Sequence, residues 1–216
     1  MSTRCSPRNS GRAGSSRTCH DRAVDRPSPR PGPDREHPAE PRGRAHRSVV
    51  AAEATASGAF DIEVVDLAEI DLPMLAQPGH PSARDYRMAC TRAFSEVTDR
   101  AAAYVFVMPE YNHSYTAALK NALDDLFWEG HGKPVILVSY GGVAAGARAA
   151  MALEPVLVAL QLHVVGFVPI PLIDQLLHPH DGRRVFRPTE PIEHGLTAAV
   201  DALHRALQPE RAARST

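Results

Sequence analysis

The sequence has 216 residues and a formal net charge of -1, which suits one α/β domain of ordinary size with a tail. A nearly neutral chain offers no electrostatic basis for binding nucleic acid or an acidic membrane. No apolar run approaches the ~20 residues that a transmembrane helix needs. The three cysteines lack the spacing of a disulfide framework or a zinc site, so we expect a reduced, cytoplasmic protein without a metal.

The composition divides the chain into three regions. Residues 1–47 are crowded with Arg, Pro, Ser and Gly and hold few large apolar side chains. Such a segment buries too little apolar area to offset its chain entropy, so it is predicted to be either disordered or frame-shifted. Residues 48–207 have the composition of a globular domain, and we expect a disordered tail over 208–216.

The first predicted elements follow the apolar pattern. Residues 49–57 are Ala-rich and suit the last turns of a helix, which Gly58 would stop. Residues 60–67 alternate apolar and polar side chains and are rich in β-branched residues, which predicts a strand. A proline-containing loop follows over 71–81, and a helix is expected over 83–101.

The remaining elements alternate between strands and helices. In order, we expect a strand over 103–108, a helix over 115–128, a strand over 135–138, a helix over 144–162, a strand over 163–170, a loop over 172–188 and a helix over 191–207. The apolar runs are continuous, as in strands buried on both faces. This alternation predicts an α/β fold with a parallel sheet covered on both sides, which binds ligands beyond the carboxyl ends of its strands.

Two segments fall at those carboxyl ends. Residues 109–115 and 139–142 each follow an apolar strand and precede a helix. Backbone N–H groups in such loops lack intrahelical partners and suit an anion or the polar edge of a planar ring. Gly141 and Gly142 allow the backbone to approach a flat ligand closely.

Four motifs resemble one known family. Pro-Glu-Tyr-Asn-His-Ser at 109–114, Ala-Leu-Lys-Asn-Ala-Leu-Asp at 118–124, Gly-Lys-Pro-Val at 132–135 and Ser-Tyr-Gly-Gly at 139–142 are similar to the NADPH-dependent FMN reductases, a family that includes azoreductases and quinone reductases. The resemblance covers roughly residues 58–170. It departs from the family pattern at Thr116 and Ala117, where members often have Pro-Gly.

The resemblance implies a flavodoxin-like fold with strand order 2-1-3-4-5, bound FMN, and NADPH or NADH as hydride donor. It also implies a small-molecule electron acceptor and a homodimer or homotetramer, with Trp128 at the interface. No catalytic side chain is implied. The FMN-contacting positions implied by the family are Pro109, Glu110, Tyr111, Asn112, His113, Ser114, Ser139, Tyr140, Gly141 and Gly142.

The first strand of that fold and its phosphate-binding loop, similar to Gly-Ser-Thr-Arg-Pro in this family, are absent from the sequence as written. Read one nucleotide later, codons 30–34 can encode Val-Leu-Val-Leu-Ile and codons 35–39 can encode Gly-Ser-Thr-Arg-Pro. A frame-shift therefore explains the missing strand 1. The alternative is a genuine disordered extension on a truncated or divergent domain.

Other interpretations stay open. The chain is either a reductase, a flavodoxin-like electron carrier without nicotinamide activity, or a degenerate product unable to bind FMN. Arg148 is either a contact for a coenzyme phosphate or an exposed structural arginine. His178 and His180 have no carboxylate or cysteine partner at ligand spacing, so we interpret them as exposed loop residues rather than metal ligands. Cys90 is expected to pack in the core.

Overall fold

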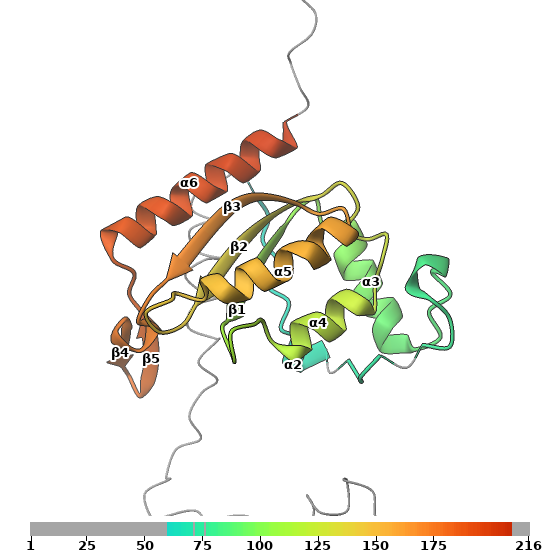
Figure 1. The fold of residues 1–216 in the computed structure, drawn as a ribbon, viewed down its shortest axis with the longest axis horizontal. Helices are drawn as coiled ribbons and strands as arrows, with labels where there is room; N and C mark the ends of the chain where they lie inside the picture. The colour runs from blue at the N-terminus through green and yellow to red at the C-terminus, as the bar shows by residue number, and fades with distance from the viewer. Residues whose placement is uncertain (1–59, 71, 76, 209–216) are drawn as a thin grey trace, which may run out of the picture. The chain divides into compact units, whose positions relative to one another are not determined.

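The computed structural model describes residues 60–70, 72–75 and 77–208 (Figure 1). The chain divides into two units, Met1–Pro38 and Ala39–Thr216, and all described residues belong to the second unit. The predictions for residues 1–59, including the frame-shifted segment and the first helix, therefore lie outside the described residues. So does the predicted tail beyond residue 208.

The described residues alternate between strands and helices, as the sequence predicts. In chain order the elements are α2 (Leu67–Ile70), η1 (Pro81–Ala83), α3 (Ala89–Arg100), β1 (Tyr104–Pro109), α4 (Ala117–Asp124), β2 (Pro134–Tyr140), α5 (Ala147–Ala159), β3 (His163–Ile170), η2 (Ile173–Gln175), β4 (Leu177–His180), β5 (Arg183–Phe186) and α6 (Glu190–Leu207).

The sheet is parallel, with the strand order β1-β2-β3. Tyr104 lies opposite Val135, and Pro134 lies opposite His163. The ladder between β2 and β3 is irregular only between Val135 and Ile136. These strands correspond to strands 3, 4 and 5 of the predicted order, so the α/β fold with a parallel sheet is confirmed.

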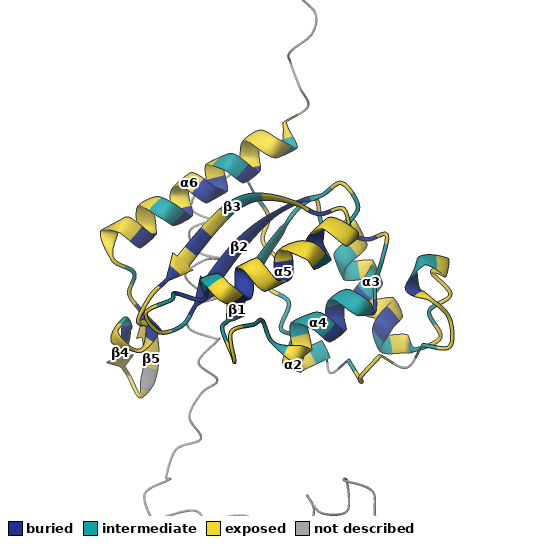
Figure 2. Ribbon diagram, in the orientation of Figure 1, coloured by how far each residue is buried: buried dark blue, intermediate teal, exposed yellow. Residues whose placement is uncertain are grey.

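Helices cover both faces of this sheet (Figure 1). Ile136 and Val138 of β2 belong to the apolar cluster that contains residues of α6. Val135 and Leu137, which alternate with them, belong to the cluster that contains residues of α5. Every residue of β2 is buried (Figure 2), which explains why its sequence is a continuous apolar run rather than an alternating one.

The predicted strand over 60–67 is wrong. Residues 60–66 have no regular secondary structure, and Leu67 begins the short helix α2. An alternating pattern shows that a segment suits a strand, but a strand also needs a hydrogen-bonded neighbour. Among the described residues the parallel sheet has only three strands, and none of them pairs with 60–66.

Three further boundaries differ from the prediction. The helix expected over 83–101 begins only at Ala89, after the separate turn η1. The helix expected over 115–128 is α4, which starts after Thr116 because the Thr116 side chain accepts a hydrogen bond from the Leu119 N–H. The loop expected over 172–188 contains η2 and the antiparallel hairpin of β4 and β5.

Candidate functional site

The two predicted loops leave the sheet side by side. Pro109, the last residue of β1, lies opposite Tyr140, the last residue of β2. The Glu110 N–H donates to the Tyr140 carbonyl at 3.0 Å, which extends the pairing into the first loop. Parallel strands place the residues that follow them at one edge of the sheet, so the two loops form a common rim there.

The first loop is a tight turn. Tyr111 and Ser114 exchange two backbone hydrogen bonds of 2.9 and 3.0 Å. Between them, Asn112 and His113 have φ values of 49° and 63°, as in the two central residues of a type I′ turn. Asparagine tolerates this left-handed conformation better than histidine does. The turn leaves the Tyr111 side chain 62% exposed at the rim.

The second loop is fixed to the end of β3. The Gly141 N–H donates to the Ile170 carbonyl at 3.3 Å, and the Leu172 N–H donates to the Gly142 carbonyl at 3.0 Å. Gly142 and Val143 are exposed. Their backbone N–H groups have no hydrogen-bond partner among the described residues. The second loop thus presents two free donors at the carboxyl edge of the sheet.

The side chains of Ser139 and Tyr140 are buried beneath the rim and do not line the site. Ser139 is fully buried, and its hydroxyl donates to the Ala145 carbonyl at 2.8 Å. Tyr140 is buried in the cluster that packs against α6. Both residues come at the end of β2, so only their backbones reach the rim, and a flavin contact through them stays a prediction.

Gly146, which the family resemblance did not place in the site, fixes the entry into α5. It has a φ of 78°, and a Cβ atom there would lie 2.7 Å from both the Ser139 Cβ and the Tyr140 backbone nitrogen. Only glycine allows this approach. The signal in the sequence is a glycine in the first turn of the predicted helix, close behind an apolar strand.

An ion pair joins the first loop to α5. The Arg148 Nη1 lies 2.6 Å from the Glu110 Oε1, and the Arg148 backbone N–H donates to the Glu110 Oε2 at 3.2 Å. The Glu110 side chain is only 10% exposed, whereas that of Arg148 is 47% exposed. A carboxylate beside the first turn of a helix is favourable. Arg148 therefore has a structural partner, and its contact with a coenzyme phosphate stays a hypothesis.

The perturbed pKa values lie at the opposite end of the sheet. Tyr104, the first residue of β1, donates through its hydroxyl to the Glu129 carbonyl at 2.8 Å. The Glu129 carboxylate accepts hydrogen bonds from the Ser95 hydroxyl at 2.6 Å and the Tyr86 hydroxyl at 2.9 Å. Burial alone would raise the pKa of Glu129, but these hydrogen bonds outweigh it and the pKa is lowered.

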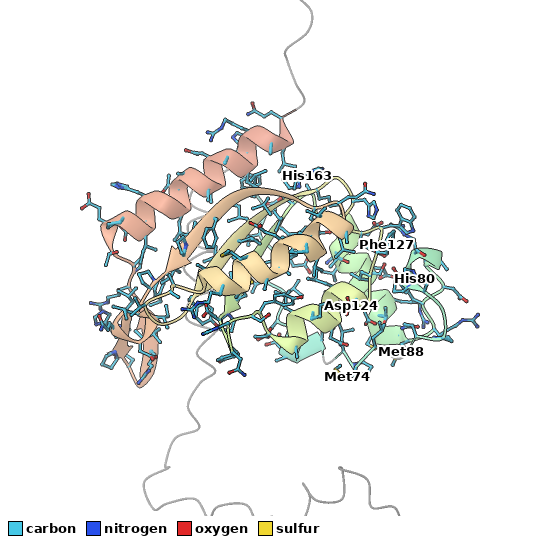
Figure 3. The ribbon with its side chains drawn as sticks, in the orientation of Figure 1. Met74, His80, Met88, Asp124, Phe127 and His163 are labelled. Atoms are coloured by element: carbon cyan, nitrogen blue, oxygen red, sulfur yellow. The ribbon has the colours of Figure 1, made fainter. Side chains whose placement is uncertain are left out.

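Aromatic side chains lie around the Glu129 carboxylate, and two tyrosines among them have shifted pKa values. Burial raises the pKa of Tyr86 and Tyr104 far above the ordinary value for tyrosine. Phe127 and His80, labelled in Figure 3, contact each other with ring centroids 5.8 Å apart. Figure 3 also labels His163, the first residue of β3. Because these groups lie at the amino ends of the strands, we interpret this cluster as structural.

Among the described residues, no group of three His, Cys, Asp or Glu side chains could hold a metal ion. His178 and His180 lie in β4 rather than in a loop, and both are exposed. No described helix combines the length and hydropathy needed to cross a membrane. Cys90 forms no disulfide among the described residues. Its side chain is half-buried, and thus less buried than the predicted core position.

The sequence profile of a family described as NADPH-dependent FMN reductase matches residues 40–170. The chain is 40% identical to an NAD(P)H-dependent FMN reductase of Saccharomyces cerevisiae over 115 residues, which is 50% of this chain and 60% of the relative. It is also 40% identical to an NAD(P)H-dependent FMN reductase of Schizosaccharomyces pombe over 128 residues, which is 56% of this chain and 59% of the relative. The chain thus spans less than two thirds of these relatives.

Solved structures share the fold. FerB, a flavoenzyme NAD(P)H:(acceptor) oxidoreductase of Paracoccus denitrificans, superimposes with a TM-score of 0.58 at 20% identity, over 79% of this chain and 92% of FerB. The apo form of an NADH:FMN oxidoreductase gives a TM-score of 0.56 at 24% identity, over 77% and 83% of the two chains. The family profile covers more than half of the chain. With its flavodoxin-like sheet and its two rim loops, the chain belongs to the NADPH-dependent FMN reductase family.

Proposed function

We propose that this protein, with its reading frame restored, is an NAD(P)H-dependent FMN reductase. Bound FMN would accept a hydride from NADPH or NADH. The reduced FMN would then pass the electrons to a quinone, an azo compound or another small acceptor. The observation that carries this proposal is the pairing of the two loops at the carboxyl edge, where Glu110 is hydrogen-bonded to Tyr140. The names of its relatives as FMN reductases support the same activity.

The rim fits the ring of FMN. The unpartnered N–H groups of Gly142 and Val143 suit the polar edge of a flavin, which carries hydrogen-bond acceptors. The exposed ring of Tyr111 offers an aromatic surface on the first loop of the rim. Bound FMN would supply the redox chemistry, while the protein positions the ring and tunes its surroundings. Hydride transfer needs no acid or base from the protein, so we propose no catalytic side chain.

The remaining predicted contacts have different roles in this proposal. Pro109, Glu110 and Ser114 shape the first loop, and Asn112 and His113 form its exposed tip. Gly141 lies against the first loop, because a Cβ atom there would be 3.6 Å from the Glu110 Cβ. We propose that these residues keep the rim in place while the backbone makes the contacts.

The described residues supply only two of the loops that a flavin nucleotide needs. We therefore expect weak or absent FMN affinity in the chain as written, because its phosphate-binding loop is missing from the sequence. A frame-restored chain, in which codons 28–52 are read one nucleotide later, is expected to bind FMN tightly. Equal tight binding by both chains would contradict this expectation.

The experiment is a flavin titration followed by reduction. Quenching of FMN fluorescence gives the affinity, and anaerobic addition of NADPH or NADH should bleach the yellow frame-restored protein. Tyr111→Ala should weaken FMN binding by about threefold to tenfold through loss of a ring contact, without changing stability. The control is Val158→Ala, which removes an exposed apolar side chain near the end of α5. This end of α5 precedes the amino end of β3, opposite the rim, so FMN binding should stay unchanged.

The same titration separates the alternatives. A yellow protein that neither nucleotide bleaches is a flavodoxin-like electron carrier. A colourless, poorly folded protein made from the sequence as written favours a degenerate product. A frame-restored protein that stays colourless contradicts the proposed activity. We also propose a cytoplasmic homodimer or homotetramer with Trp128 at its interface. Sedimentation of the wild-type protein and of Trp128→Ala would test the assembly.

A further inference from the structure

The hairpin of β4 and β5 begins at the second rim loop. The Leu172 N–H donates to the Gly142 carbonyl at 3.0 Å, and the Ile173 N–H donates to the Gly141 carbonyl at 3.1 Å. Only the short turn η2 separates these contacts from β4. The hairpin therefore lies at the carboxyl end of β3, at the edge of the sheet that carries the candidate site (Figure 1).

The base of the hairpin is anchored in the core. Leu177 and Phe186 lie opposite each other, and both belong to the apolar cluster that contains Tyr140. Next to this pair, the Arg187 N–H donates to the Leu176 carbonyl at 2.9 Å. Because buried side chains and a closing hydrogen bond hold its base, the hairpin carries its exposed side chains on a fixed element rather than on a free loop.

The exposed part of the hairpin carries unpaired positive charge. Arg184 and Arg187 are exposed, and their guanidinium groups have no hydrogen-bond or ion-pair partner among the described residues. Five other arginines have acceptors for their guanidinium groups, namely Arg84, Arg87, Arg92, Arg100 and Arg148. The Asp181 carboxylate at the tip of the hairpin lies 3.7 Å from the His180 Nε2. Two arginines of the hairpin are thus free to bind an anion.

Arg184 lies on the face of the hairpin that is turned to the core. It comes two residues before Phe186 in β5, so both side chains point to the same face, with Arg184 about 7 Å nearer the tip. Phe186 is buried and Arg184 is exposed, so the core ends between them. The Arg184 guanidinium thus lies beyond the core on the inner face, whereas His178 and His180 are on the outer face.

The two rim loops supply no free cation of their own. Residues 109–115 and 139–143 contain no lysine or arginine. Arg148, near the start of α5, is neutralised by Glu110 at 2.6 Å. A phosphate group at this edge of the sheet would therefore find unpaired arginines in the hairpin. A guanidinium suits such a group, because its paired N–H donors match the spacing of phosphate oxygens.

We propose that Arg184 and Arg187 bind the 2′-phosphate of NADPH and thereby select NADPH over NADH. The two coenzymes differ only in this group, which carries a charge of about −1.5 to −2 at pH 7. The proposal rests on the proposed reductase activity, because it requires the nicotinamide to lie against a flavin at the rim. The adenosine end of the coenzyme then extends beyond the rim, and the hairpin is the cationic element at that edge.

The experiment titrates the full 216-residue chain with two nucleotides, without flavin. Adenosine 2′,5′-bisphosphate carries the 2′-phosphate of NADPH, and 5′-AMP is the same nucleotide without that group. Nuclear magnetic resonance titrations give both dissociation constants. We expect the bisphosphate to bind more tightly by about tenfold or more, the factor for one hydrogen bond between charged groups.

Substitutions at exposed positions locate the phosphate contact. Arg184→Gln should reduce the preference for the bisphosphate, and the double variant with Arg187→Gln should abolish it, while the affinity for 5′-AMP stays unchanged. The matched control is Arg205→Gln, which removes the same charge from an exposed arginine of α6 that also has no partner among the described residues. This control should keep the full preference.

Two results would overturn the proposal. The first is equal affinity of the wild-type chain for the two nucleotides, which includes no measurable binding of either. The second is an equal loss of preference in Arg184→Gln and Arg205→Gln, because net charge alone would then explain it. Failure of the reductase activity gives a different result: NADPH would not reduce bound FMN, yet a nucleotide preference that depends on Arg184 would stand.

Discussion

Replacing Gly146 by alanine tests how the second loop is built. The added Cβ would lie 2.7 Å from the Ser139 Cβ and 2.7 Å from the Tyr140 backbone nitrogen, which are parts of a buried strand that cannot move away easily. The residue would also keep a φ of 78°, which disfavours side chains by about 1–2 kcal/mol. Overpacking adds about 1–3 kcal/mol. Gly146→Ala should therefore destabilise the protein by about 2–5 kcal/mol.

Gly142→Ala is the matched control, because it lies in the same loop and a Cβ there has nothing within 4 Å. We expect its free energy of unfolding to stay within about 0.5 kcal/mol of the wild type. In urea, Gly146→Ala should lower the unfolding midpoint on the order of 1 M with an unchanged slope. Equal midpoints for the two variants would refute the close packing of α5 on the end of β2.

Two further predictions concern other parts of the fold. Glu129→Gln should destabilise the protein at pH 7 by about 1–3 kcal/mol, because the carboxylate is 1% exposed and accepts hydrogen bonds. Since the pKa of Glu129 is lowered by folding, its contribution is present above the ordinary glutamate value of about 4.3 and is lost as the pH falls through the folded value. Urea titrations at several pH values should show a flatter acid limb in the variant. Thr116→Ala should cost about 1 kcal/mol by removing the cap on the Leu119 N–H, while Thr116→Ser should retain most of it, as thermal unfolding would show.

The sequence predicts the central strand β2 well because every residue of that strand is buried. A run such as Val135 to Val138 has no polar residue, and its length and flanking residues distinguish a strand from a helix. The prediction of a strand over 60–67 was wrong because it rested on alternation alone. An alternating pattern indicates a half-buried strand, but the neighbour that would pair with it is not encoded in the pattern itself.

The hairpin of β4 and β5 has a turn signal in the sequence at Asp181-Gly182. Asp181 and Gly182 have φ values of 47° and 74°, as in a two-residue type I′ turn, for which Asp-Gly is a favoured sequence. The His178-Pro179-His180 segment obscured it, because proline weakens a strand prediction. The motif order predicted that the two loops follow strands and precede helices, as they do after β1 and β2. It did not show that Ser139 is buried or that Arg148 pairs with Glu110, since those depend on packing between elements.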